Sequence, residues 1–237
     1  APEATVLACE IVDEIRGTCS KIRLKLVLDD KTKSAGIPEL VMLKGGFEAH
    51  SRELCYMHER EVRGYRDVLK EIPLPAPTCF FADYDAERKQ GIIIMEDLAA
   101  NGATFCHALK PQSFEQVARR LEVLARYHAT TWGSPDIEPN GKWGDMVDFL
   151  DTVDRFFAQK TSPENWQRFL NAPRGVASSV IFQDREWMLD AWRRLKHFTK
   201  QQTYCLLHGD IHLGNLYIDS NGEPVAVVPG QDGGALD

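Results

Sequence analysis

A carboxylate and an amide lie five residues apart in one loop of the chain, within the sequence HGDIHLGN from His208 to Asn215. Transfer of a phosphoryl group needs a carboxylate that orients the attacking hydroxyl and accepts its proton, and an oxygen ligand for the metal ion on the nucleotide phosphates. Asp210 and Asn215 fit these two roles. An HGD tripeptide can arise in a turn by chance, but eight residues between two predicted apolar strands form a far more specific pattern. We expect His208 to brace the loop and His212 to be a bystander rather than a phosphate contact.

A lysine and a glutamate in the first hundred residues could hold the phosphates of the same nucleotide. The stretch from Val41 to Lys44 matches the V-A-I-K pattern that places a lysine on the third strand of kinases. An ammonium there can neutralise the α- and β-phosphates if a carboxylate on the following helix holds it in place. Glu61 is the expected partner, with Glu53 and Glu59 as weaker candidates. Each residue alone could belong to a solvated surface, but their order ahead of the HGD motif favours a functional pair.

The HGD form of the loop and its flanks, LLHGDIHLGNLYI, resemble the aminoglycoside phosphotransferase and choline-kinase-like superfamily, and look closest to its ecdysteroid-kinase-like branch. The resemblance extends from about Val6 to Val228 and implies a two-lobed α+β protein-kinase-like fold that binds ATP and Mg²⁺. The stretch IIIMEDL resembles the hinge of this superfamily. That implies that backbone groups near Glu96 and Leu98 hydrogen-bond adenine and that Met95 controls the pocket behind it. A buried strand that runs into a capped turn is the alternative reading of this stretch.

Two parts of the superfamily pattern are weak or missing. The turn Gly17-Thr18-Cys19-Ser20 has a single glycine, so it would contribute at best a backbone N–H or the Ser20 hydroxyl to phosphate binding. The superfamily places a metal-binding Asp after the last hairpin strand, where this chain has Pro229. Asp232 could reach the metal in a remodelled loop, the end of the chain could be altered or damaged, or the protein could bind nucleotide without efficient turnover. We favour the second explanation, because the departure coincides with the end of the sequence at Asp237.

Composition and charge limit the classes of function. The formal net charge of −7 argues against a nucleic-acid binder, because phosphate contacts need a clustered positive surface. No charged-then-apolar leader and no run of about 18 apolar residues are present, which indicates neither secretion nor a membrane span. The six cysteines are scattered and form no C-x-x-C pair, so reduced thiols in the cytoplasm are the simplest expectation. The first residue is Ala1, so the native protein could begin further upstream.

The order of predicted elements divides the chain into two lobes. Alternating apolar residues predict strands over 6–15, 21–28, 39–45, 78–83 and 91–95. Helical periodicity predicts helices over 53–70, 113–132, 145–159, 163–170 and 185–200, the second with a capping box formed by Ser113 and Gln116. Short strands are expected at 204–207, 216–218 and 225–228. We therefore predict an N-terminal nucleotide-binding lobe over 1–97 and a helical catalytic lobe over 98–237 that is incomplete at its end.

These inferences predict a kinase that moves the γ-phosphate of ATP to a hydroxyl of a small molecule. Asp210 is the expected base, Lys44 and Glu61 are expected at the phosphates, and Asn215, with Asp232, on Mg²⁺. The main alternative is a nucleotide-binding protein without turnover, which Pro229 favours. A protein kinase is disfavoured by the missing arginine of the H-R-D loop and the absent A-P-E segment, and a structural protein that reuses the fold is a further alternative. The sequence determines neither the acceptor nor the oligomeric state.

Overall fold

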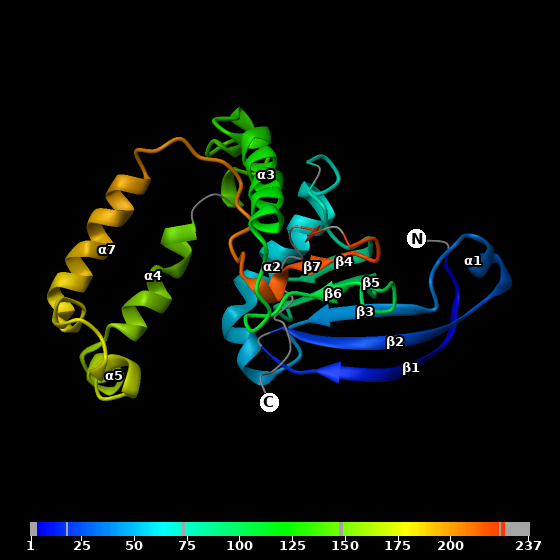
Figure 1. Ribbon diagram of the computed structural model, residues 1–237, viewed down its shortest axis with the longest axis horizontal. Coiled ribbons are helices and arrows are strands. Elements are labelled where there is room, and N and C mark those ends of the chain that lie inside the picture. The colour runs from blue at the N-terminus through cyan, green and yellow to red at the C-terminus, as the bar shows by residue number, and fades with distance from the viewer. Residues whose placement is uncertain (1–3, 18, 73, 147–148, 223, 226–237) are drawn as a thin grey trace. The chain divides into compact units, whose positions relative to one another are not determined.

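The computed structural model of the chain describes residues 4–17, 19–72, 74–146, 149–222 and 224–225. The chain forms two compact units (Figure 1): residues up to Ala129 together with those from Leu207 onward make the first, and Thr130–Leu206 make the second. The division at residues 97 and 98 remains a prediction. Pro229 and Asp232, which the sequence analysis singled out, lie outside the described residues.

The first unit contains a five-stranded antiparallel sheet with the strand order β1-β2-β3-β5-β4 (Figure 1). The strands are β1 (Val6–Ile15), β2 (Ser20–Leu28), β3 (Leu40–Gly45), β4 (Cys79–Asp85) and β5 (Gln90–Glu96). Every end lies within two residues of its predicted position. Alternating side chains therefore suffice to locate these strands, because successive side chains of a strand point to opposite faces of the sheet.

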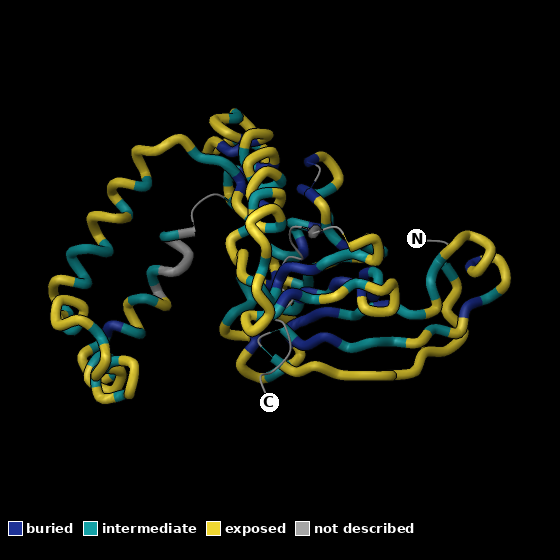
Figure 2. The backbone as a smooth tube through the Cα atoms, in the orientation of Figure 1, coloured by how far each residue is buried: buried dark blue, intermediate teal, exposed yellow. Residues whose placement is uncertain are grey.

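The core of this unit lies between the sheet and the helix that follows β3. Ile93 and Met95 of β5 are buried together with Val62 and Tyr65 of the helix, in register with the alternation of the strand. β1, at the edge of the sheet, is exposed along its whole length, as Figure 2 shows. The centre of the sheet is therefore the rigid part on which a buried polar group can be placed.

The helix between β3 and β4 changes type twice along its length. It begins as a 3₁₀ helix over Ala49–Leu54, continues as α2 (Cys55–Arg63) and ends in a π-helical turn over Gly64–Val68. The Leu69 N–H donates to the Gly64 carbonyl at 2.9 Å and closes this wider turn. The sequence predicted one continuous helix over 53–70. The π-turn is a local departure that apolar periodicity does not report, because it adds one residue to a single turn.

A short helix was not foreseen in the segment 29–38, which the sequence indicated to be a polar connection. Residues Asp30–Ser34 form α1, and the Asp29 carboxylate accepts a hydrogen bond from the Thr32 N–H at 2.8 Å. Asp is a strong N-cap residue, and this cap satisfies one of the amide groups that a helix start leaves unpaired. The segment is a capped helical turn rather than a loop.

The rest of the first unit combines a helix with a small antiparallel sheet of strand order β6-β7-β8. Its strands are β6 (Thr104–Phe105), β7 (Tyr217–Ile218) and β8 (Pro224–Val225), so the predicted late hairpin is present and a third short strand joins it. The helix α3 (Phe114–Thr131) begins with the predicted capping box. The Ser113 N–H donates to Gln116 Oε1 at 3.0 Å, and the Gln116 N–H donates to Ser113 Oγ at 3.2 Å.

The second unit is helical. After the end of α3 it contains α4 (Phe149–Lys160), α5 (Pro163–Leu170), α6 (Pro173–Val176) and α7 (Arg185–Thr199). The prediction of a strand over 204–207 was wrong. The Leu206 N–H donates to Thr131 Oγ1 and the Tyr204 carbonyl accepts from the Gly133 N–H, both at 2.9 Å, so this backbone is bonded to the end of α3 instead of to a strand. Within the described ranges, none of the helices has the length and apolar character needed to cross a bilayer.

Candidate functional site

The amine of Lys44 and the carboxylate of Glu61 form a buried ion pair. Lys44 lies on β3 at the centre of the sheet, and its Nζ is 2.5 Å from Oε1 of Glu61 on α2. Their side chains are 1% and 13% exposed, whereas Glu53 and Glu59, the weaker candidates, are exposed. An unpaired ammonium at this depth would cost several kcal/mol, and the contact with the Glu61 carboxylate offsets this cost. The predicted pair is present.

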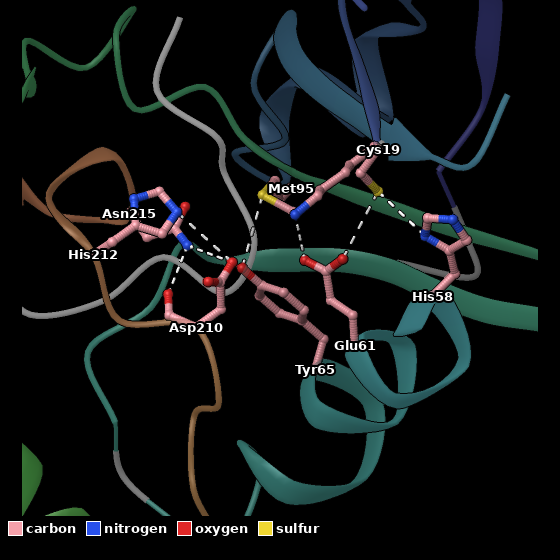
Figure 3. A network of polar contacts seen from close by, with 9 residues as sticks. Cys19, His58, Glu61, Tyr65, Met95, Asp210, His212 and Asn215 are labelled. Atoms are coloured by element: carbon pink, nitrogen blue, oxygen red, sulfur yellow. Dashed lines mark hydrogen bonds and ion pairs between the residues drawn. The ribbon is translucent and has the colours of Figure 1, made fainter. Parts of the chain in front are cut away.

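A thiol and an imidazole extend this pair toward the turn between β1 and β2 (Figure 3). Cys19 Sγ lies 3.9 Å from Glu61 Oε2 and 3.5 Å from Nδ1 of His58, which is one turn earlier on α2. His58 is buried, and its Nε2 has no hydrogen-bond partner. Burial, and then the positive charge of Lys44, lower the pKa of His58. No sequence pattern predicts this contact, because the two residues come from distant elements.

The hinge predicted at the end of β5 has a defined set of hydrogen bonds. The Glu96 N–H donates to the Thr78 carbonyl at 2.9 Å, and Glu96 Oε1 accepts from the Thr78 N–H at 2.7 Å. Met95 is fully buried, with its Sδ 3.9 Å from the Tyr65 hydroxyl. The Leu98 carbonyl accepts from Ala103, whereas within the described ranges the Leu98 N–H donates to no backbone carbonyl. Leu98 therefore offers a donor of the kind that an adenine ring needs.

Asp97 lies between these hinge residues and connects the hinge to strand β2 of the sheet. Its side chain is 1% exposed, forms an ion pair with Arg23 of β2, and accepts the N–H groups of Ala99 and Ala100 at 3.1 and 3.2 Å. The hydrogen bond to Asp97 raises the pKa of the Arg23 guanidinium. The sequence analysis placed Asp97 in the hinge motif but did not identify Arg23, since a charged residue in a half-buried strand carries no specific signal.

The HGD loop is organised by a single buried amide. Asn215 ends a 3₁₀ turn just before β7 and is fully buried. Its Nδ2 donates to the Asp210 carbonyl at 2.7 Å and to Asp210 Oδ2 at 3.1 Å, so one side chain fixes both the backbone and the carboxylate of Asp210 (Figure 3). Gly209 has a φ of +87°, a backbone conformation that favours glycine over residues with a Cβ.

Two histidines support the same loop. Nδ1 of His208 accepts the Asp210 N–H at 3.2 Å, which is the bracing contact expected from the sequence. Nδ1 of His212 accepts the Gly214 N–H at 3.1 Å, and its Nε2 lies 3.7 Å from Asp210 Oδ2. The expectation that His212 is a bystander therefore needs correction, because this side chain caps the 3₁₀ turn and borders the Asp210 carboxylate.

The described residues include one atom that suits a divalent cation. Asn215 Oδ1 is buried and has no hydrogen-bond donor. Leaving a buried acceptor unpaired costs about 1–3 kcal/mol, and Mg²⁺ prefers oxygen ligands, so a cation at this atom would remove the cost. The residues present thus fit the predicted metal on the side of Asn215. The other predicted ligand, Asp232, lies outside the described residues.

Ser20, the candidate phosphate contact in the turn, begins β2 opposite Gly45. It is fully buried, and its hydroxyl lies 3.5 Å from Glu48 Oε1. The structure therefore places the hydroxyl toward Glu48, and a phosphate contact of Ser20 stays a prediction.

Each of these groups that the structure describes belongs to the first unit. Figure 3 shows some of them in one close view, with Glu61 and Tyr65 on the helix and Asp210 and Asn215 on the loop. A sequence profile of the phosphotransferase enzyme family matches residues 58–228, which is well over half of the chain. The chain belongs to the phosphotransferase enzyme family. The match includes Glu61, the hinge and the HGD loop, and begins after Lys44.

Three solved structures illustrate what this family member is similar to. APH(2")-IIia in complex with GDP and kanamycin has 10% identity and a TM-score of 0.49, over 99% of this chain and 70% of that protein. A thermostable mutant of the aminoglycoside phosphotransferase APH(4)-Ia, in a ternary complex with ADP and hygromycin B, has 14% identity and a TM-score of 0.44 over 95% and 66%. The GDP complex of a mutant of aminoglycoside 2'-phosphotransferase-IIIa has 10% identity and a TM-score of 0.42 over 96% and 67%.

The chain thus spans about two thirds of the length of these phosphotransferases. Among curated protein sequences, nothing matches it. The predicted resemblance to the aminoglycoside phosphotransferase and choline-kinase-like superfamily is confirmed by the family match, and so is the predicted α+β fold with a sheet lobe and a helical region. Its assignment to the ecdysteroid-kinase-like branch stays a prediction.

Proposed function

We propose that this chain carries the nucleotide-binding and catalytic residues of a kinase that transfers the γ-phosphate of ATP to a hydroxyl of a small molecule. Membership of the phosphotransferase enzyme family supports the class of reaction. The observation that carries the proposal is the Asp210–Asn215 pair. A half-exposed carboxylate is held by a buried amide whose Oδ1 has no donor, which is the combination that a base and a metal ligand require.

The nucleotide would be held by groups on the sheet and hinge. The Lys44 amine, kept charged by Glu61, would contact the phosphates, and the Leu98 N–H would donate to adenine, with Met95 closing the pocket behind it. Asn215 Oδ1 would ligate Mg²⁺, which when bound supplies positive charge at the phosphate oxygens. The role of Glu96 would be indirect, because its N–H and carboxylate are bonded to Thr78.

The transfer step itself would depend on Asp210. Its carboxylate would accept the hydrogen bond of the acceptor hydroxyl and take up the proton as the oxygen attacks the γ-phosphorus. The bond from the γ-phosphorus to the bridging oxygen breaks in the same transfer, and ADP leaves. The Asp210 carboxylate is suited to this because it is half-exposed, and the Asn215 amide and His212 Nε2 lie beside its Oδ2. The six free cysteines support a reducing, cytoplasmic location for the reaction.

The test is direct measurement of phosphate transfer. The chain is incubated with ATP or GTP, with Mg²⁺ or with a chelator, and with a pool of hydroxyl-bearing small molecules that includes kanamycin, hygromycin B, choline, sugars and sterol-like alcohols. Nucleoside diphosphate and phosphorylated acceptor are both quantified. We expect Mg²⁺-dependent transfer to at least one acceptor, and a loss of about 10²–10⁴-fold in the Asp210→Asn variant with nucleotide binding nearly unchanged.

The other outcomes separate the alternatives. Nucleotide binding without transfer to any acceptor would favour a nucleotide-binding protein that has lost turnover, as the substitution at Pro229 suggests. No thermal shift with any nucleotide would contradict the proposal altogether and favour a structural role. Unchanged turnover in Asp210→Asn would remove Asp210 from the role of base.

A further inference from the structure

The turn between β1 and β2 is joined to the Lys44–Glu61 pair by a side-chain contact of Cys19. We infer that Cys19 and His58 are positioning residues that hold the Glu61 carboxylate in the orientation that serves Lys44 and tie the turn to α2. This inference rests on the proposed function, because it assigns these residues a part in nucleotide binding.

The two oxygens of Glu61 have different partners. Oε1 accepts from Lys44 Nζ at 2.5 Å, and Oε2 faces the Cys19 thiol at 3.9 Å (Figure 3). The last torsion of a glutamate side chain is soft, so a carboxylate held at one oxygen can rotate about it. A second contact at Oε2 removes this freedom, because rotation would break one of the two interactions. The thiol therefore restrains the direction in which Oε1 presents its lone pairs to Lys44.

The tautomer of His58 decides the direction of its contact with Cys19. A thiol has one hydrogen, so if it donates to Glu61 Oε2 the sulfur accepts from Nδ1 of His58. Nε2 is buried without a hydrogen-bond partner among the described residues. A Cβ on Gly46 would lie 2.6 Å from Nε2, so the backbone fills the space on that side. Burial and Lys44 lower the pKa of His58, which keeps the ring neutral as this arrangement requires.

This arrangement explains how a turn with one glycine can be placed over the phosphates. In a glycine-rich loop, backbone N–H groups approach the phosphates because no side chain is in the way. Here Cys19 lies two residues after Gly17, and its side chain points to the helix instead of to solvent. The turn and the Glu61 carboxylate would then move together. Loss of the thiol should weaken nucleotide binding more than it slows the transfer step.

The experiment compares variants that keep or remove one donor. Cys19→Ala removes the contact with Glu61 and should raise the KM for nucleotide about two- to tenfold with little change in kcat, the range expected for one hydrogen bond. Cys19→Ser keeps a donor and should recover part of this loss. Cys9→Ala, at an exposed thiol on the edge strand, is the matched control and should leave both constants unchanged.

Alkylation provides a second measurement that needs no variant to fold. N-ethylmaleimide adds a thiol across its double bond, so a sulfur–carbon bond forms and the proton goes to the neighbouring carbon. Nucleotide affinity should fall in proportion to modification of Cys19, located by mass spectrometry, and should not follow modification of Cys9.

Three results would overturn the inference while leaving the proposed function intact. These are a wild-type KM in Cys19→Ala, equal KM values in Cys19→Ala and Cys19→Ser, or unchanged nucleotide affinity after modification of Cys19. Failure of the unmodified protein to bind any nucleotide would instead contradict the proposed function itself.

Discussion

The two halves of the candidate site are built in opposite ways. The nucleotide half rests on β3, at the centre of a five-stranded sheet, and pairs an almost fully buried lysine with a glutamate from α2. The transfer half lies in a loop that ends in a 3₁₀ turn just before β7, a strand of two residues, and its carboxylate, Asp210, is 54% exposed. One buried amide, Asn215, holds it.

The difference follows from what each half has to do. A lysine that binds phosphates needs a strong field and a fixed position, which burial and an opposite charge supply. A carboxylate that takes a proton from an incoming hydroxyl must be reachable. The residues proposed to bind the nucleotide phosphates are accordingly buried, and the carboxylate proposed to accept the proton is half-exposed.

The largest expected effect tests whether substitutions in the nucleotide half lower the free energy of unfolding more than substitutions in the transfer half. Glu61→Gln leaves the Lys44 ammonium buried without its charge partner and should reduce the free energy of unfolding by about 3–5 kcal/mol in urea. Lys44→Met should cost less, because the carboxylate left behind is more exposed than the amine. The double variant Lys44→Met/Glu61→Gln should be more stable than Glu61→Gln alone. Equal stabilities for the two single variants would contradict the expectation that an unpaired Lys44 amine costs more than an unpaired Glu61 carboxylate.

The next prediction applies the same test to the transfer half. Asn215→Ala removes the two hydrogen bonds to Asp210 and should reduce the free energy of unfolding by about 1–3 kcal/mol. Its effect on Mg²⁺-dependent transfer should exceed its effect on nucleotide affinity, because the affinity depends mainly on the sheet. Asn221→Ala, at an exposed position in the β7–β8 turn, is the control and should change stability by less than about 0.5 kcal/mol. A variant of Asn215 with wild-type transfer would show that the loop does not need this amide.

A smaller effect is expected at the hinge, which joins the nucleotide half to the rest of the first unit. Arg23→Gln removes the cation beside the buried Asp97 carboxylate, but the N–H groups of Ala99 and Ala100 remain as donors. We expect a loss of about 1–2 kcal/mol in stability and a higher KM for nucleotide at unchanged kcat. Arg88→Gln is the matched control, since Arg88 is 83% exposed and pairs with Asp85 in the exposed turn between β4 and β5. Equal KM values for the two variants would separate Asp97 from adenine binding.

Sequence patterns located most of the fold because they report one-dimensional periodicity. The five strands and the capping box of α3 were predicted from alternation and from the Ser113 and Gln116 spacing, and the structure has both. The prediction of a strand over 204–207 was wrong for a physical reason. Its apolar residues suit a buried extended segment, but a Thr131 hydroxyl and the turn after α3 bond to its backbone. The pattern of apolar residues in a segment does not determine which groups its backbone will hydrogen-bond.

The candidate site was predictable where order along the chain determines the partner. Lys44 and Glu61 follow from a strand and the next helix, and Asp210 and Asn215 lie in one loop. The Cys19–His58 and Arg23–Asp97 contacts depend on register and on side chains from distant elements. β1 and β2 also shift register twice, near Val6–Ala8 and Ile11–Asp13, which no alternation pattern reveals. These contacts needed the three-dimensional structure.

The smallest expected effect is a pH dependence confined to the nucleotide half. The pKa of His58 in the folded protein is lowered below the ordinary value of 6.5, by burial and then by Lys44. Above pH 6.5 neither the folded nor the unfolded chain holds the proton, so the histidine costs nothing. As the pH falls below 6.5, the unfolded chain takes up a proton that the folded protein binds less readily, and stability decreases by at most about 1.4 kcal/mol per pH unit.

The direction of this pKa shift is set first by burial of His58 and then by the positive charge of Lys44, against which a backbone hydrogen bond with Ser51 acts. Urea unfolding between pH 7 and pH 5 should therefore show a smaller loss of stability in His58→Asn than in the wild type, whereas exposed His50→Asn should follow the wild-type curve. Identical curves for His58→Asn and the wild type would mean that the imidazole is protonated as easily in the folded protein as in the unfolded chain. The thiol could then not accept from a neutral ring, and Glu61 would keep its orientation by its contact with Lys44 rather than by the turn.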